Sequence, residues 1–169
     1  MRGIFLTLLC FSANCHADFP LDLCTPAEKI VFSCTLGAKT ASICASPDLT
    51  ETSGYVQYRF GTDKQLELVY PKTLLPPKAK FFFSSTAYAG GDADRIRFKI
   101  AGFDYVVFHS MIRTNFKPGE PNDPQESAGL VTRSKGNYGR PRKCDNFIAG
   151  DAAAYGYFDK EPFDDTLTP

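Results

Sequence analysis

Four cysteines that follow a short N-terminal leader constrain the fold of this chain more than any other feature. Cys24, Cys34 and Cys44 are spaced ten residues apart, whereas Cys144 stands a hundred residues further on. An even number of cysteines in an exported domain predicts two disulfides. Unless Cys144 is free, one bridge must join the beginning of the domain to its end. The spacing therefore predicts a small β-domain that is held together by disulfides.

Residues 1–17 have the three parts of a secretory signal peptide. Arg2 supplies the positive charge, residues 4–11 form a short apolar stretch, and small residues precede a cleavage site at Asp18. The apolar stretch is shorter than the roughly 20 residues that cross a bilayer. The alternatives are a cytosolic N-terminal helix and a lipoprotein anchor, but neither early cysteine follows the small residue that lipoprotein cleavage prefers. We therefore expect a periplasmic or secreted protein with no transmembrane segment.

The composition of the whole sequence favours one aromatic-rich β-domain. Fifteen Phe and eight Tyr, with no Trp, favour strands and fill the cores of sandwiches and barrels. Basic and acidic side chains balance at 19 each, which gives no reason to expect nucleic acid as a partner. The length suits a single domain with its own core.

Alternation of apolar and polar residues recurs along the chain, and helical periodicity is nearly absent. Residues 96–107 give the clearest hairpin pattern, with Ala101-Gly102 as a two-residue turn. This register places Lys99 opposite Asp104, an opposite-charge pair, and a slip by one residue would turn every side chain to the other face.

A second hairpin is expected around Gly37-Ala38, which separates two apolar stretches. A tight turn there places Cys34 opposite Ala41, and Cys44 then lies three positions beyond. A bridge between Cys34 and Cys44 would need a longer or bulged turn, so the residues leave the disulfide pairing open.

These patterns predict a mainly β fold, either a small antiparallel barrel or a compact sandwich of roughly eight strands, as a single domain over residues 18–148. Residues 149–169 are acidic and are expected to form a loosely ordered tail. The tail either lies back over the basic stretch at 133–143 or leaves that stretch to bind an acidic partner. The 14-residue polar loop Thr114–Ser127 is of a length typical of functional or disordered loops.

Catalytic and metal-binding patterns are scarce. The only histidine after the leader, His109, lies opposite Asp94 in the hairpin register, and the two are expected to form a pair at a sheet edge; a general base tuned by this carboxylate is the alternative. A lone histidine gives no metal-site pattern and no hydrolase triad, and we expect no cofactor. The carboxylates available to a glycosidase-like pair are those of Glu67, Asp92, Asp94 and Asp104, at separations that the sequence does not define.

Most of residues 24–144 resembles a family of uncharacterised exported proteins of Gram-negative bacteria. The stretches that carry this resemblance run from Phe32 to Cys44 and from Gly54 to Gly61, together with the glycine-rich loop, the later hairpin and Cys144. The family implies export and supplies no known activity.

The segment from Ser84 to Tyr88, with the Gly/Asp loop and strand that follow, resembles the Ser-Gly-x-x-Tyr segment of the periplasmic inhibitors of C-type lysozymes. Those inhibitors are small antiparallel β-barrels with a disulfide between early and late strands, and their Ser/Tyr loop enters the lysozyme cleft. The resemblance implies that Ser84 and Tyr88 are the inhibitory pair, and that Cys34 pairs with Cys144, which leaves Cys24 with Cys44. Ser85 replaces the glycine of the motif.

The second inhibitor motif, Tyr followed five residues on by Lys-Gly, is not kept at Ile96, Ala101 and Gly102. The resemblance therefore predicts the fold and the loop, and not lysozyme itself as the partner. An ordinary strand end that enters a glycine-rich loop is the simpler interpretation of the same residues.

We expect an exported domain that binds or inhibits another protein of the bacterial envelope, such as a cell-wall hydrolase or a delivered toxin, and that is not an enzyme. The expected binding residues are those of one loop: Ser84, Ser85, Tyr88, Gly90, Gly91 and Asp92. The alternatives are a secreted carboxylate-dependent hydrolase of glycan or peptidoglycan and a structural envelope module.

Overall fold

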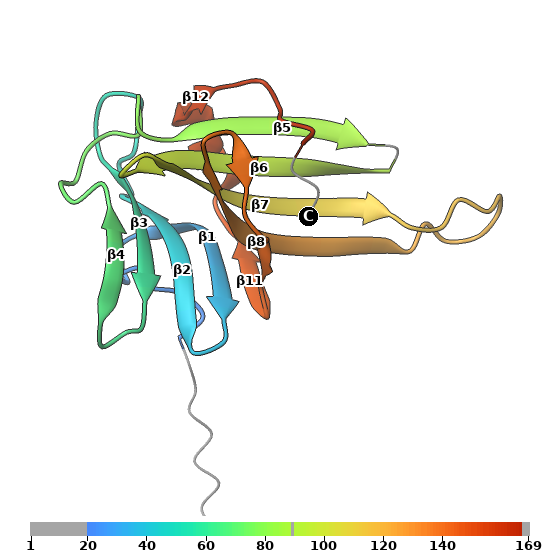
Figure 1. Cartoon of the computed structure of the whole chain (residues 1–169), viewed down its shortest axis with the longest axis horizontal. Coiled ribbons are helices and arrows are strands. Elements are labelled where there is room, and N and C mark those ends of the chain that lie inside the picture. Colours follow the sequence, from blue (N-terminus) through green and yellow to red (C-terminus); the bar gives the residue numbers. More distant parts are fainter. Residues whose placement is uncertain (1–19, 89, 167–169) are drawn as a thin grey trace, which may run out of the picture.

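The computed structural model describes residues 20–88 and 90–166, so the expected signal peptide, residues 1–17, lies outside the described residues. Within the described residues the strands form two separate sheets, and the strands of one sheet run across those of the other (Figure 1). The mainly β fold is confirmed, and of the two expected architectures the compact sandwich fits. Twelve strands are described instead of roughly eight, because short pairings of two to four residues add to the longer strands.

The five-stranded sheet has the order β11-β1-β2-β3-β4. Its strands are β1 (Lys29–Leu36), β2 (Lys39–Ala45), β3 (Val56–Gly61), β4 (Leu66–Tyr70) and β11 (Asn146–Ala149). The seven-stranded sheet has the order β10-β8-β7-β6-β5-β12, and β9 pairs with β8 beside this path. Its strands are β5 (Phe82–Tyr88), β6 (Gly91–Ile100), β7 (Phe103–Arg113), β8 (Pro124–Ser134), β9 (Asn137–Tyr138), β10 (Arg142–Lys143) and β12 (Asp159–Lys160).

The two hairpin registers predicted from the sequence are confirmed. In β6 and β7, Phe98 lies opposite Tyr105 and Lys99 lies opposite Asp104. In β1 and β2, Cys34 lies opposite Ala41. Both registers place alternate apolar side chains between the two sheets, where they form one core, because a strand turns successive side chains to opposite faces.

Both disulfides expected from the inhibitor resemblance are present. Cys24 is bonded to Cys44, and Cys34 is bonded to Cys144 across a sequence separation of 110 residues. The second bridge joins the first strand of the core to the segment between β10 and β11.

Residues 149–166 are not the loosely ordered tail that the sequence predicts. They contain the 3₁₀ helix η1 (Ala152–Tyr157) and β12, which pairs in parallel with β5. Ala154 and Phe158 are 3% and 4% exposed, and Phe158 stacks on Phe81 at 5.7 Å. These apolar side chains complete the core, which explains why the segment docks despite its acidic composition.

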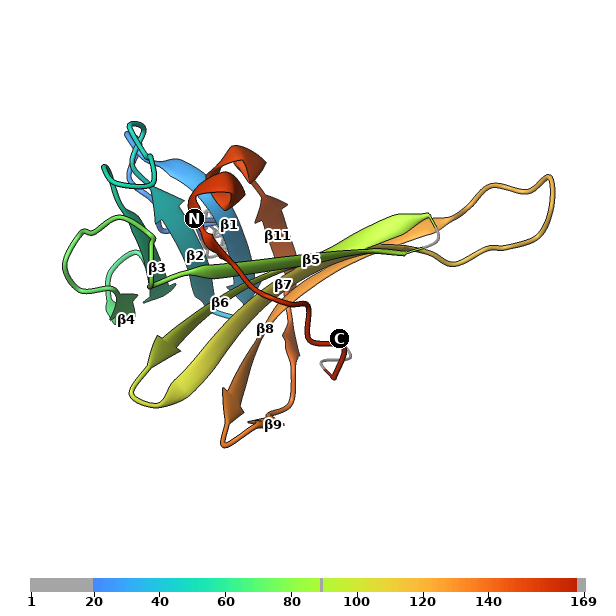
Figure 2. The same cartoon turned by 90° about the horizontal axis from the view of Figure 1, so that it is seen from above.

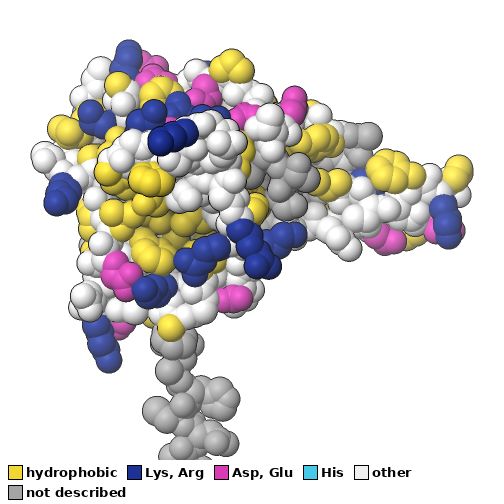
Figure 3. Space-filling model, in the orientation of Figure 1, with side chains coloured by type: hydrophobic (Ala, Val, Ile, Leu, Met, Phe, Trp, Pro, Cys, Tyr) yellow, Lys and Arg dark blue, Asp and Glu magenta, His cyan; other side chains and the backbone are white. Residues whose placement is uncertain are grey.

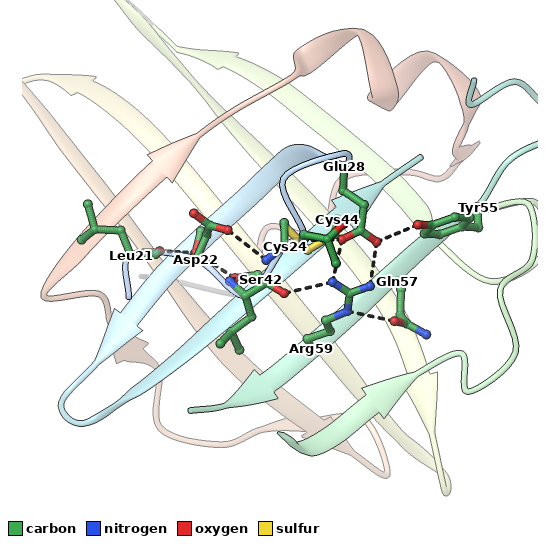
Figure 4. The surroundings of a disulfide bond; sticks show 12 residues. Leu21, Asp22, Cys24, Glu28, Ser42, Cys44, Tyr55, Gln57 and Arg59 are labelled. Atoms are coloured by element: carbon green, nitrogen blue, oxygen red, sulfur yellow. Dashed lines mark hydrogen bonds and ion pairs between the residues drawn. A yellow bond between two sulfur atoms is a disulfide. The ribbon is translucent and has the colours of Figure 1, made fainter. Parts of the chain in front are cut away.

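An N-terminal segment, residues 20–28, covers the outer face of the five-stranded sheet and is fixed there by a buried ion pair. Arg59 of β3 contacts both carboxylate oxygens of Glu28, at 2.7 and 2.6 Å, and also donates to the carbonyl of Leu23 (Figure 4). The Tyr55 hydroxyl donates to the same carboxylate at 2.9 Å. The Cys24–Cys44 bridge lies beside this network and ties the segment to β2.

The four long strands β5 to β8 extend as an arm beyond the five-stranded sheet, and the β7–β8 connection reaches furthest (Figure 2). The predicted polar loop Thr114–Ser127 is shorter than expected, because β8 already begins at Pro124. Within the loop, the amides of Thr114 and Asn115 both donate to the carbonyl of Asn122, at 3.2 and 3.1 Å. The arm therefore ends in a loop with its own hydrogen bonds.

Candidate functional site

The expected binding residues lie on a tight hairpin and not in a loop. β5 continues to Tyr88 and β6 begins at Gly91, with Tyr88 and Gly91 as partners. Gly90 takes a positive φ of 86°, a backbone conformation that glycine adopts at little cost in a short turn. Ser84 and Ser85 are ordinary strand residues, paired with Arg95 and Asp94.

Gly91 packs against β7 so closely that an added Cβ would collide with the carbonyl oxygen of Met111. This close approach brings Tyr88 and Ile112 to the same end of the arm, on either side of Gly91. A second contact involves Arg113, whose Cβ would lie 3.0 Å from a Cβ at position 90. The end of the arm therefore gathers side chains from β5, β7 and the β7–β8 loop.

We call this group, Tyr88, Ile112, Arg113 and Phe116, the arm tip. Tyr88, Ile112 and Phe116 are 44%, 39% and 61% exposed, high values for large apolar side chains. Arg113 stacks on the ring of Phe116 at 4.7 Å and donates to the carbonyl of Asn115. Of these residues only Tyr88 was predicted from the sequence. For Phe116 the available sign was an aromatic residue inside a polar loop.

Ser84 belongs to a different place, a hollow of about 360 Å³ on the outer face of the seven-stranded sheet. Arg95 and Arg97 of β6 and Arg133 of β8 line it, because these residues alternate with core residues along their strands. Asp104 lies between them and accepts from Arg97 and Arg133, each at 3.2 Å. We call this group of three arginines the arginine face.

The C-terminal segment, residues 161–166, covers the arginine face. Glu161 pairs with Arg97 at 2.5 Å, and Asp164 pairs with Arg133 at 2.8 Å. Between these pairs the ring of Phe163 lies 3.8 Å from the guanidinium of Arg95. The acidic end of the chain therefore lies back over one residue of the predicted basic stretch, Arg133.

Docking of this segment is accompanied by two shifted pKa values. Bonds from the Thr166 and Tyr138 hydroxyls lower the pKa of Asp164 from 3.8 to about 2. Burial, followed by the hydrogen bond to Asp164, raises the pKa of Tyr138 to about 12. The docked carboxylate is thus ionised over the whole neutral and mildly acidic range, and burial together with this carboxylate keeps Tyr138 protonated.

We expect that Asp164→Ala lowers the pKa of Tyr138 from about 12 toward its usual value of 10. The substitution removes the acceptor of the phenol and leaves the positive charge of Arg133 beside it, which favours the phenolate. NMR titration of the tyrosine ring resonances measures the shift. Tyr155 serves as the control, because burial and the charges of Asp94 and Asp151 raise its pKa to about 12 without Asp164. An unchanged Tyr138 titration would contradict docking of this carboxylate.

The four carboxylates considered for hydrolysis do not form one cluster. Glu67 lies on β4 and pairs with Lys39, whereas the other three lie in the seven-stranded sheet. Asp104 is on the outer face, where it also pairs with Lys99, and Asp92 and Asp94 are on the opposite face. The carboxylate of Asp104 is thus part of an ion-pair network with three cations.

His109 has the register expected of it but not the expected contact. It lies opposite Asp94, yet its buried Nε2 has no hydrogen-bond partner and its ring packs against Phe147 at 5.4 Å. An Asp94–His109 acid–base pair is therefore not formed.

Within residues 20–88 and 90–166, no helix is long and apolar enough to span a bilayer. The chain matches no protein-family model, no curated protein and no solved structure.

Proposed function

We propose that this chain is an exported domain that binds another protein of the bacterial envelope, and that the arm tip is its contact surface. Two disulfides are typical of an oxidising compartment such as the periplasm. The observation that carries the proposal is the exposure of three large apolar side chains at the end of a projecting arm.

The arm suits insertion into a cleft of a partner. Tyrosine and arginine are enriched among the residues that dominate binding energy in protein interfaces. Paired strands hold Tyr88 and Arg113 in place, and stacking on Arg113 orients Phe116. Little conformational entropy is then lost on binding. Ser84 is buried beside the arginine face, whereas Tyr88 is exposed at the arm tip, so exposure favours Tyr88 of the expected Ser/Tyr pair as a contact residue.

We expect the double variant Tyr88→Ala/Phe116→Ala to bind its partner at least tenfold more weakly than the wild type, because interface aromatics often contribute about 2 kcal/mol or more each. The partner is recovered by pull-down from an envelope extract, and the affinity for the purified partner is then measured; a C-type lysozyme is tested in parallel by an inhibition assay.

Leu74→Ala is the matched control, since Leu74 is 50% exposed and lies outside the arm, between β4 and β5. If the arm-tip variant and the Leu74 variant both keep the wild-type affinity, the contact surface lies elsewhere. A carboxylate-dependent hydrolase has less support, because its four candidate carboxylates do not lie in one cluster.

A further inference from the structure

An open pocket lies at one corner of the sandwich, where the two sheets part. Hydrophobic side chains gather on this face of the molecule, and Lys and Arg side chains border them (Figure 3). The pocket has a volume of about 200 Å³, and its apolar lining comes from both sheets: Tyr58, Phe60 and Leu68 on one side, and Tyr105 and Leu130 on the other.

The floor of the pocket is a rigid stack of aromatic rings. Phe98, which is fully buried, packs against Tyr58 at 4.6 Å and stacks on Tyr105 at 5.5 Å. Both tyrosines line the pocket, and Thr132 adds a polar side chain to its lining. Because these rings are held by the core, the pocket exists without any ligand.

Two arginines stand at the edge of this pocket. Arg142 lies opposite Leu130 across the β10–β8 pairing, so its side chain turns toward the gap between the sheets. Its positive charge acts on Tyr58 at the pocket floor. Burial raises the pKa of Tyr58, Tyr105 raises it further, and the charge of Arg142 lowers it. Arg140 lines the same pocket from the connection between β9 and β10.

The charges of Arg140 and Arg142 are not compensated by the rest of the described chain. No carboxylate among residues 20–88 and 90–166 lies within ion-pair distance of either guanidinium. By contrast, the arginine face is neutralised in part by Asp104 and by the C-terminal segment. An exposed pair of arginines beside an apolar pocket therefore leaves positive charge available to a ligand at this corner.

We propose that this corner pocket binds a small amphipathic anion, with a short acyl chain or a single aromatic ring in the apolar part and a carboxylate or phosphate group between Arg140 and Arg142. The volume limits the ligand, since sites for drug-sized molecules measure roughly 300–1,000 Å³. The guanidinium groups favour these head groups because they donate hydrogen bonds in a planar fork that matches both. The site is separate from the arm tip and does not depend on the proposed protein partner.

Octanoate is the first probe, titrated into the full chain with bridges intact and followed by the NMR methyl resonances of Leu68 and Leu130. We expect saturable shifts of both. Octan-1-ol and octylamine have the same chain with a neutral or cationic head group, and we expect each to bind at least tenfold more weakly. Octyl phosphate distinguishes the two head groups, because the tighter of the two anions identifies the preferred one. Equal binding of octanoate and octylamine would overturn the proposal.

The variant Arg140→Gln/Arg142→Gln is expected to weaken the binding of octanoate, or of octyl phosphate if that binds more tightly, by at least tenfold. Lys143→Gln removes the same type of charge from the neighbouring residue, whose side chain turns to the opposite face, and is expected to leave the affinity unchanged. All three residues are exposed, so unaltered thermal unfolding is expected for both variants. If both variants bind as the wild type does, or if both weaken binding equally, the arginines do not form the site.

Discussion

The substitution Glu28→Gln is expected to lower the free energy of unfolding by about 3–5 kcal/mol, the usual cost of removing one partner from a buried ion pair. The Glu28 and Arg59 side chains are only 1% and 10% exposed. Glutamine keeps the size of the side chain but not its charge, so the guanidinium of Arg59 is left buried without a counter-ion. Denaturant unfolding followed by circular dichroism measures the loss.

The same carboxylate makes the stability depend on pH in a predictable direction. Burial by itself would raise the pKa of Glu28, but hydrogen bonds from Arg59, from the Thr25 amide and from Tyr55 outweigh it and lower the pKa from 4.5 to about 2. A carboxyl with a lowered pKa in the folded state stabilises that state above its unfolded pKa. This contribution is complete above about pH 4.5 and is lost as the pH falls toward 2. The Glu28→Gln variant should lack this part of the acid destabilisation.

Glu67→Gln provides the matched control, because it removes an equivalent charge from an exposed pair. The side chains of Lys39 and Glu67 are 42% and 39% exposed, and such surface pairs contribute about 0–1 kcal/mol. Equal losses in the Glu28 and Glu67 variants would show that the covered network adds nothing beyond a surface ion pair.

Local pairings of this fold were accessible from the sequence, because a hairpin brings together residues that are close in the chain. The turn at Ala101-Gly102 and the alternation around it determine the β6–β7 register, and the Lys99–Asp104 pair follows from that register. The disulfide pairing was different, since the residues left it open and only the inhibitor resemblance indicated Cys34 with Cys144.

Contacts between distant segments were not accessible in the same way. Glu28 and Arg59 are 31 residues apart, and Arg97 and Glu161 are 64 apart, with no local pattern to join them. The acidic composition after residue 148 suggested disorder. The segment docks because Phe158 is buried in the core and Glu161 pairs with Arg97 of the arginine face.

In the candidate sites, too, local features were predictable from the sequence and contacts between distant segments were not. The sequence placed Tyr88 in a glycine-rich loop, but it could not show that Ile112 and Arg113 reach the same turn, because this depends on how β5, β6 and β7 align. The corner pocket is formed by both sheets, so its residues are recognisable only after the sheets are packed.

Removal of the bridge between Cys34 and Cys144 is expected to have the second large effect. We expect removal of either bridge to lower stability, and only removal of this one to weaken binding at the corner pocket. In the chain-entropy model, a closed loop of 110 residues contributes about 5 kcal/mol and one of 20 residues about 3 kcal/mol. Cys34→Ala/Cys144→Ala should therefore destabilise the domain more than Cys24→Ala/Cys44→Ala does, as measured by thermal unfolding of the two double variants.

Only the longer bridge supports the corner pocket. Cys144 follows Arg142 by two residues, its amide donates to the carbonyl of Ala128 at 2.9 Å, and the disulfide ties this segment to β1. Without the bridge, β10 keeps its two residue pairs with β8, and β11 keeps its pairing with β1, but the covalent restraint two residues from Arg142 is lost. We expect the guanidinium of Arg142 to be less well positioned as a result. We expect the Cys34/Cys144 variant to bind the preferred octyl anion at least tenfold more weakly under conditions in which it remains folded. The Cys24/Cys44 variant should bind as the wild type does, because that bridge lies on the far side of the five-stranded sheet; equal binding by both variants would mean that β10 holds the arginines without the disulfide.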